Sequence, residues 1–153
     1  MAKKDKKKSA DDSKLIQELN QLLATYQVFY QNLRGIHWNI KGQNFFDLHV
    51  KFEELYTDAQ LKIDEVAERI LTLGHQPLHT YSDYLKQSLV KEAKNITKDV
   101  DAVRMITENL TILIKFEKAT MKHADGDQST EDLLTQFIVY QEKTLWMFKA
   151  WLG

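Results

Sequence analysis

Apolar residues recur every three or four positions along four long stretches of the chain. From Leu15 to Leu33 the spacings alternate between four and three residues, which places these side chains on one face of a helix. The same kind of spacing recurs over residues 45–73, 100–113 and 134–152. The pattern therefore predicts four amphipathic helices, each of which buries one face against the others.

Segments rich in polar residues and glycine separate the predicted helices. Residues 11–13 can cap the start of the first helix, and Gly35 together with residues 41–44 is expected to end it. Gly74 and Pro77 are expected to end the second, because glycine favours the position after a helix and proline cannot continue one. These signals bound the first two helices.

The second half of the chain contains a long connection and two further helix boundaries. Residues 75–94 separate the second helix from the third and leave room for a short helix near residues 81–85. Residues 125–127 end the third helix, and Ser129, with Asp132 three residues later, resembles a capping box that opens the fourth. Four long helices with this connection predict an all-α fold, a crossover four-helix bundle, of which the ferritin-like fold is one member. A bundle without any chemistry fits the helix pattern equally well.

The composition fits one soluble domain and excludes several kinds of site. The chain has 153 residues, of which 43% are hydrophobic, and it contains no cysteine. Disulfides, zinc–thiolate sites, iron–sulfur clusters and cysteine nucleophiles are therefore excluded. A chain of this length can bury a sufficient core without covalent reinforcement.

The formal net charge of −1 conceals two oppositely charged parts. Residues 1–8 contain five lysines and one aspartate, a charge of +4, which leaves −5 on the rest of the chain. We therefore predict a flexible lysine-rich tail over residues 1–10 and a bundle domain over residues 11–153. Polar residues follow the lysines, which argues against a signal peptide, and no apolar run is long enough to span a membrane. We expect a cytoplasmic protein with no membrane partner.

Two pairs of potential metal ligands lie on the second predicted helix. His49 and Glu53 are one turn apart, and so are Asp64 and Glu68. Glu53 and Asp64 are separated by 11 residues, which at about 100° per residue returns to within about 20° of the same direction. Imidazole with several carboxylates is a ligand set for iron, manganese or zinc. Each pair taken alone is more typical of a solvated helix face.

Helix geometry keeps the two pairs apart within one chain. A rise of about 1.5 Å per residue places Glu53 and Asp64 about 16 Å apart along the axis, beyond the reach of one metal ion. The pairs form either two weak separate sites or two halves that meet across a two-fold axis between subunits. His37, near the end of the first helix, is a further potential ligand. The chain has no Glu-x-x-His pair of the kind that binds iron inside a bundle, so any iron site is expected at an interface.

Two ordered blocks of the sequence resemble the signatures of the Dps-type mini-ferritins, the DNA-binding proteins from starved cells. The first block is His37-Trp38-x-Ile40-x-Gly42, followed by Leu48-His49 and Glu53. The second block is Asp64-Glu65-Val66-Ala67-Glu68-Arg69, followed by Leu73-Gly74 and Pro77. A third segment, Trp146-Met147-Phe148-Lys149-Ala150, resembles the end of the family's last helix. The resemblance covers residues 13–153.

The resemblance implies a ferroxidase that forms a hollow homododecamer of ferritin-like bundles. Such cages oxidise Fe(II), preferably with hydrogen peroxide, at di-iron sites shared across two-fold interfaces, and they store Fe(III) and so protect DNA from oxidative damage. By position, His37, His49 and Glu53 would come from one subunit, and Asp64 and Glu68 from its partner. Many members have aspartate where this chain has Glu53, so its carboxylate reaches iron either directly or through water.

The resemblance also assigns roles beyond the iron ligands. Trp38 matches an aromatic residue that passes electrons or absorbs oxidising equivalents beside the family's site. A tryptophan packed in an interface explains the same residue equally well. Acidic residues at the start of the last helix match iron-entry pores at three-fold axes, and these are Asp127, Glu131 and Asp132. Helix capping is the competing explanation for Asp132.

Some members of the family bind DNA through lysine-rich tails, which the N-terminal lysines resemble: Lys3, Lys4, Lys6, Lys7 and Lys8. Such lysines contact phosphates and therefore support only sequence-independent binding. A solvated terminus explains the same residues without any partner. Two alternatives to an iron-storing ferroxidase stay open. One is a nucleoid-associated DNA-binding protein with little ferroxidase turnover, and the other is a cage that binds zinc or another ion without turnover.

Overall fold

A computed structural model describes the backbone of residues 2–153 and the side chains of residues 13–153. Its helices are α1 (Ala2–Asn39), α2 (Phe45–Thr72), α3 (Tyr81–Gln87), α4 (Asp99–Met121) and α5 (Gln128–Leu152). The described backbone contains no β-strand. The predicted all-α fold, with four long helices and a short one in the connection between the second and the third, is confirmed. None of the described helices is long and apolar enough to cross a membrane.

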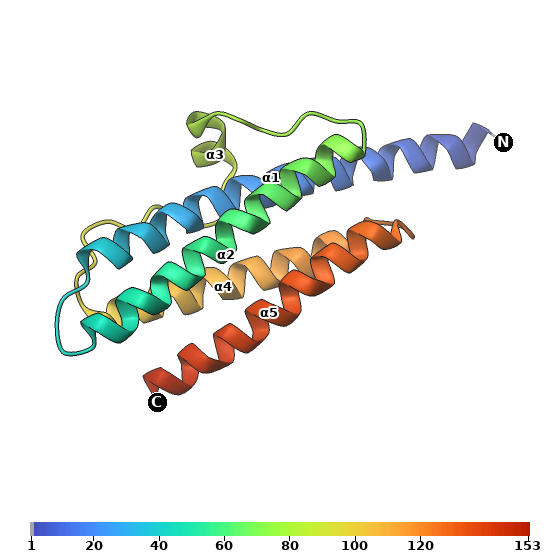
Figure 1. The fold of residues 1–153 in the computed structure, drawn as a ribbon. Coiled ribbons are helices and arrows are strands. Elements are labelled where there is room, and N and C mark those ends of the chain that lie inside the picture. The colour runs from blue at the N-terminus through green and yellow to red at the C-terminus, as the bar shows by residue number, and fades with distance from the viewer. Residues whose placement is uncertain (1) are drawn as a thin grey trace.

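The four long helices form two antiparallel pairs (Figure 1). α1 packs against α2, α4 packs against α5, and α1 also contacts α4. After α2 the chain returns along α1, where α3 packs, before α4 begins. α4 consequently runs parallel to α2, which is the crossover arrangement that the long connection predicts.

Polar side chains of α1 hold this connection in place. Asn32 accepts a hydrogen bond from the backbone N–H of Ala93 at 2.8 Å. Asn20 accepts one from the N–H of Leu78 at 2.8 Å, and the hydroxyl of Thr25 accepts a third backbone N–H at 3.1 Å. The connection has little regular structure, so α1 supplies partners that its backbone donors would otherwise lack.

Gly74 ends α2, as predicted, and the local geometry explains the choice of residue. Its φ angle of 84° lies in the left-handed region, which favours glycine. The N–H of Gly74 bonds the carbonyl of Leu71 at 2.9 Å, and the N–H of His75 bonds the carbonyl of Ile70 at 3.1 Å. These two bonds form a Schellman motif, which satisfies carbonyls that the end of a helix leaves open.

The predicted start of the first helix and the predicted role of Gly35 in ending it are wrong, whereas the helix does end just before residues 41–44, at Asn39. α1 begins at Ala2 rather than at residues 11–13, because lysine and alanine favour helix and neither glycine nor proline interrupts this segment. Gly35 lies inside α1, where its cost of about 1 kcal/mol is outweighed by the burial of Leu33 and Ile36. The predicted division between a tail of residues 1–10 and the bundle stays a prediction, because the tail's side chains lie outside the described part of the chain.

The start of α5 differs from the predicted capping box. The helix begins at Gln128, so Ser129 lies within its first turn and Asp127 occupies the N-cap position. The carboxylate of Asp127 accepts a hydrogen bond from the Thr130 hydroxyl at 2.6 Å and pairs with Arg69 of α2 at 2.7 Å. Burial acts to raise the pKa of Asp127, but the bonds from Thr130 and Arg69 outweigh it and hold the pKa below 3.8. A contact between distant helices has thus replaced a local cap.

The core contains a polar cluster that the hydrophobic pattern does not predict. Glu117 of α4 and Gln141 of α5 are 0% and 2% exposed, and Tyr26 of α1 is buried with them. The Tyr26 hydroxyl donates to Oε1 of Glu117 and accepts from Nε2 of Gln141. Nε2 of Gln141 also donates to Oε1 of Glu117 at 3.1 Å. Within the described part of the chain, Oε2 of Glu117 and Oε1 of Gln141 lack a protein partner.

Burial of this cluster favours the neutral form of its carboxyl group. Desolvation raises the pKa of Glu117 from 4.5 to about 7, and the hydrogen bonds from Tyr26 and Gln141 and the charge of Lys62 oppose only part of this rise. Desolvation, followed by the neighbouring Glu117, raises the pKa of Tyr26 well above its usual value of 10. A neutral Glu117 also carries an O–H donor, which an ionised carboxylate lacks.

We predict that Glu117→Gln makes the protein less sensitive to alkaline pH. Because the folded-state pKa of Glu117 is raised, the stability that its neutral form contributes is complete below about pH 4.5 and is lost as the pH rises through about 7. The shift from 4.5 to about 7 corresponds to about 3 kcal/mol of lost stability. Glutamine keeps the size and the neutral donor but cannot ionise. Thermal unfolding at about pH 5 and about pH 8.5 should show a smaller fall in Tm for the variant. An equal fall in both proteins would contradict the prediction.

Candidate metal centre

Two histidines close the corner between α1 and α2. His37 lies in the last turn of α1, and His49 lies near the start of α2. Nδ1 of His37 bonds the backbone carbonyl of His49, and Nδ1 of His49 bonds the backbone carbonyl of His37, both at 2.7 Å. The two rings stack with their centroids 3.7 Å apart and their planes inclined by 13°. Each imidazole is therefore held by the backbone of the other residue.

These hydrogen bonds determine which ring nitrogens can bind a metal ion. A carbonyl oxygen only accepts hydrogen bonds, so the Nδ1 atoms of His37 and His49 must both carry the hydrogen. In a neutral imidazole the other nitrogen, Nε2, then carries a free lone pair. A backbone carbonyl on the far nitrogen is a common support for a metal-binding histidine. Both histidines thus have the tautomer that a metal site requires.

Aromatic side chains enclose the two imidazoles. Phe45 stacks on His49 with the ring centroids 4.9 Å apart, and Tyr56 contacts His37 edge to face at 5.2 Å. His37 is only 7% exposed, and His49 is half-buried. These contacts restrict the orientation of both rings. Phe45 and Tyr56 were not among the predicted site residues, although Tyr56 follows His49 by two helical turns, a spacing that places both on one face.

The predicted carboxylate ligands lie on the exposed side of α2. Glu53, Asp64 and Glu68 are all exposed, and Glu53 is one turn from His49. α2 is a single continuous helix, so Glu53 and Asp64 are about 16 Å apart along its axis. Among the described residues, no three His, Cys, Asp or Glu side chains are grouped so that they could hold a metal ion. One chain brings His37 and His49 together but leaves Asp64 and Glu68 about three and four turns away from Glu53.

Large apolar side chains surround these carboxylates on the same side of α2. Val50, Leu61 and Leu71 are 56%, 62% and 57% exposed. At about 100° per residue, all three lie within about 80° of Glu53 around the helix. Exposed apolar residues gathered with charged ones are typical of a protein–protein interface. The outer face of α2 therefore has the character of a surface that another chain covers.

The remaining predicted site residues occupy three different environments. Trp38 is 55% exposed, and the guanidinium of Arg34 lies 4.7 Å from its ring centroid. Asp127, a predicted pore residue, is engaged within the chain by the ion pair that joins α5 to α2. Glu131 is half-buried, and the exposed Asp132 accepts a hydrogen bond from a glutamine side chain at 2.7 Å. The pore and electron-transfer roles of these residues stay predictions, as does the role of the tail lysines.

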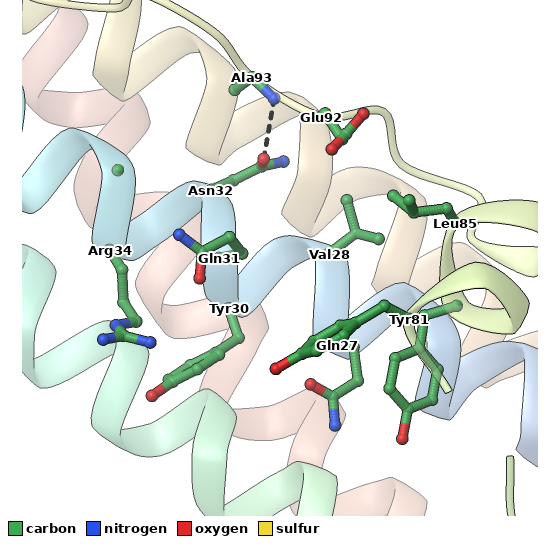
Figure 2. Close-up of a pocket in the computed structure, with 12 residues that line it drawn as sticks. Gln27, Val28, Tyr30, Gln31, Asn32, Arg34, Tyr81, Leu85, Glu92 and Ala93 are labelled. Atoms are coloured by element: carbon green, nitrogen blue, oxygen red, sulfur yellow. Dashed lines mark hydrogen bonds between the residues drawn. The ribbon is translucent and has the colours of Figure 1, made fainter. Parts of the chain in front are cut away.

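A cavity of about 380 Å³ lies on the other side of α1, beneath the connection that carries α3 (Figure 2). Figure 2 shows Tyr30 and Arg34 of α1 and Tyr81 of α3 around it, and the hydrogen bond from Ala93 to Asn32 at its edge. None of the predicted iron ligands belongs to its lining. The predicted metal ligands therefore lie outside this cavity.

Comparison with known protein families and sequences gives a consistent result. Residues 16–153 match the family model of the ferritin-like domain. A DNA protection during starvation protein of Porphyromonas gingivalis is 42% identical over 139 residues, which cover 90% of this chain and 87% of that protein. The general stress protein 20U of Bacillus subtilis is 39% identical over 141 residues, which cover 91% of this chain and 97% of that protein.

A solved structure shares the same fold over nearly the whole chain. The Dps protein of Vibrio cholerae O1 has a TM-score of 0.92 and 46% sequence identity to this chain. The match covers 94% of this chain and 92% of that one. That protein is described as a member of a broad superfamily of ferritin-like diiron-carboxylate proteins.

We predict that His37 and His49 are both Nδ1–H tautomers in the metal-free protein at mildly alkaline pH. Nitrogen-15 NMR of the sedimented, histidine-labelled protein distinguishes the two tautomers by the chemical shifts of protonated and unprotonated ring nitrogens. The two signals are identified by their loss in His37→Gln and His49→Gln, with the exposed His75→Gln as the control. An Nε2–H tautomer at either position would mean that the carbonyl does not hold the ring.

Proposed function

Because the chain belongs to the Dps-type mini-ferritins of the ferritin-like family, we propose that it oxidises Fe(II) with hydrogen peroxide and stores the Fe(III) product inside a hollow homododecamer. The observation that carries this proposal is the division of the ligands along α2. The imidazoles of His37 and His49, with Glu53, form one half of a site, and Asp64 and Glu68 form the other half.

A two-fold axis across α2 brings complementary halves together. When two copies of the helix pack antiparallel, the start of one lies beside the end of the other, and the same contact is repeated twice. Asp64 and Glu68 of each copy then face His49 and Glu53 of the other. The exposed Val50 and Leu61 supply the apolar area that such a contact would bury. The pair of subunits has two complete sites, and the single subunit has none.

The donor set suits the oxidation of iron. Neutral imidazoles bind Fe(II), and carboxylates stabilise the higher charge of Fe(III). Two Fe(II) ions each give one electron to hydrogen peroxide, which takes up two protons and becomes two molecules of water. Since both electrons arrive at one site, no hydroxyl radical is released. Glu53 acts as a ligand either directly or through water, because its side chain is one methylene longer than aspartate.

Entry of iron into the cage is assigned to the acidic residues at the start of α5. Glu131 and Asp132 lie in the first turn and a half of this helix, and neither forms a salt bridge with another described residue. A ring of such carboxylates around a three-fold axis raises the local concentration of cations. Asp127 supports this surface from within the chain through its pair with Arg69.

We predict that Asp64→Asn combined with Glu68→Gln abolishes rapid oxidation of Fe(II) by peroxide. The substitutions keep side-chain size but remove the charges that stabilise Fe(III). The matched control is Glu65→Gln, an exposed acidic residue one position further around the same helix. Stopped-flow absorbance of Fe(III) gives the rate for each protein. A wild-type rate in the double variant would contradict the site, and Fe(II) binding without any oxidation in the wild type would indicate a passive metal-binding cage.

Co-assembly of two inactive chains tests whether the sites are shared. One chain carries His49→Ala, and the other carries Asp64→Asn with Glu68→Gln. In a mixed pair of subunits, one site carries every substitution and the other site carries none. Random 1:1 reassembly should therefore restore about one quarter of the intact sites, because about half of the pairs are mixed. Sites formed within one chain would give no recovery.

Binding of DNA through the N-terminal tail is the second candidate function. Its support is the cluster of five lysines within the first eight residues, on a chain whose remaining charge is −5. A homologue from Porphyromonas gingivalis is named for DNA protection during starvation. Many tails on one cage would bind a duplex together, so the combined affinity would exceed that of one tail. The acidic body would restrict the contact to the tails.

We predict that a protein starting at Ser9 loses DNA binding at low salt and keeps its oligomeric size. Each phosphate contact releases counterions, so binding by the full chain should weaken steeply as salt is added. Gel shifts of a random-sequence duplex with both proteins, at several salt concentrations, measure the difference. Equal mobility of the duplex with the two proteins would contradict DNA binding by the tail. Iron oxidation would then be the remaining proposed function.

A further inference from the structure

A row of aromatic rings extends from the predicted iron ligands along the contact between α1 and α2. His49 stacks on His37 at a centroid distance of 3.7 Å, and His37 contacts Tyr56 at 5.2 Å. Tyr56 in turn contacts Tyr30 at 6.0 Å, with the ring planes 85° apart. Each neighbouring pair is in van der Waals contact or close to it. The row therefore joins the site to two phenol groups without a gap.

The two tyrosines occupy matching positions on the two helices. Tyr30 precedes His37 by seven residues on α1, and Tyr56 follows His49 by seven residues on α2. Two helical turns place each tyrosine on the same face as its histidine. Both phenol rings are half-buried, which shields them in part from bulk solvent. Tyr56 is the one that touches a ligand ring directly.

We propose that Tyr56, in contact with Tyr30, donates the second electron to peroxide when a site contains only one Fe(II). This inference rests on the proposed ferroxidase function. One Fe(II) supplies a single electron, and peroxide needs two. Tyr56 supplies the second electron from its phenol and loses the phenolic proton. Fe(II), tyrosine and hydrogen peroxide thereby give Fe(III), a neutral tyrosyl radical, hydroxide and water. The His37 ring, which Tyr56 contacts, is the path for the electron.

The surroundings of Trp38 favour Tyr56 over Trp38 as this donor. The guanidinium of Arg34 lies 4.7 Å from the Trp38 ring and 5.3 Å from the Tyr30 ring. Removal of an electron from tryptophan leaves a cation on the ring, which a guanidinium at this distance destabilises. Tyrosine loses its proton together with the electron, so its radical is neutral and is less affected. Arg34 therefore makes Trp38 the harder of the two residues to oxidise.

The test uses assembled full-length protein loaded with one Fe(II) for each two-iron site. Hydrogen peroxide is added, the sample is frozen within seconds, and the radical is recorded by electron paramagnetic resonance. We expect a tyrosyl signal whose hyperfine splitting changes when ring-deuterated tyrosine is incorporated and does not change with deuterated tryptophan. We expect Tyr56→Phe to lose most of this signal. Tyr81→Phe, which removes an exposed phenol outside the row, should keep it.

A second measurement does not depend on how Tyr56→Phe folds. A nitroso spin trap is added to the wild-type reaction, and peptide mapping by mass spectrometry locates the adduct. Adducts on Tyr56 or Tyr30 support the proposal. Adducts on Trp38, a signal that responds only to deuterated tryptophan, or a full tyrosyl signal in Tyr56→Phe would overturn it. Absence of Fe(II) oxidation in the wild type would instead contradict the proposed function, so the two failures are distinguishable.

Discussion

The rigidity of α2 is the constraint on which the rest of the site depends. An α-helix advances about 1.5 Å per residue, so Glu53 and Asp64 are too far apart along α2 to bind the same metal ion. Helix geometry therefore separates the predicted ligands of one chain into two groups. One group lies near the start of α2, and the other lies about three turns further along it. In the proposed site, the missing ligands come from α2 of a second subunit. The proposed chemistry therefore depends on a long, uninterrupted α2, which is also an element of the bundle.

The corner between α1 and α2 shows how the backbone prepares one of these groups. His37 and His49 belong to different helices, yet each imidazole bonds the main chain of the other. The two rings are consequently oriented by the same turn that brings the ends of the helices together. Phe45 and Tyr56 cover the rings on either side. The helix pair that builds the fold also positions the two imidazoles of the proposed metal centre.

Much of this architecture could be predicted from the sequence, because helices and their ends are encoded locally. The apolar spacing gave the four long helices, and Gly74 stopped α2 through a backbone conformation that glycine favours. The early start of α1 reflects local helix propensity, whereas two other errors concern contacts between distant residues. Gly35 stays helical because its neighbours are buried, and Asp127 replaces Ser129 at the start of α5 because it meets Arg69. Neither the helix packing around Gly35 nor the pairing of Asp127 with Arg69 can be recognised from a short stretch of sequence.

The same limit applies to the candidate site. His37, His49 and Glu53 could be singled out from spacing and resemblance, whereas the reciprocal hydrogen bonds of the imidazoles depend on how the ends of the two helices meet. Glu117 belongs to an amphipathic helix, where a glutamate is ordinarily exposed. Its burial beside Tyr26 and Gln141 depends on three helices at once, so no single stretch of sequence contains the signal.

The attachment of the long connection to α1 has a consequence for how the chain folds. The hydrogen bonds from Leu78 to Asn20, from Leu89 to Thr25 and from Ala93 to Asn32 join residues that are 58, 64 and 61 positions apart. Contacts so distant in sequence form slowly, because the loop they close must first lose its conformational freedom. α1 and α2 can pair early through their short turn, whereas the crossover must wait for a finished α1 to receive it. We therefore expect the crossover to dock late, onto a few amide and hydroxyl groups of α1.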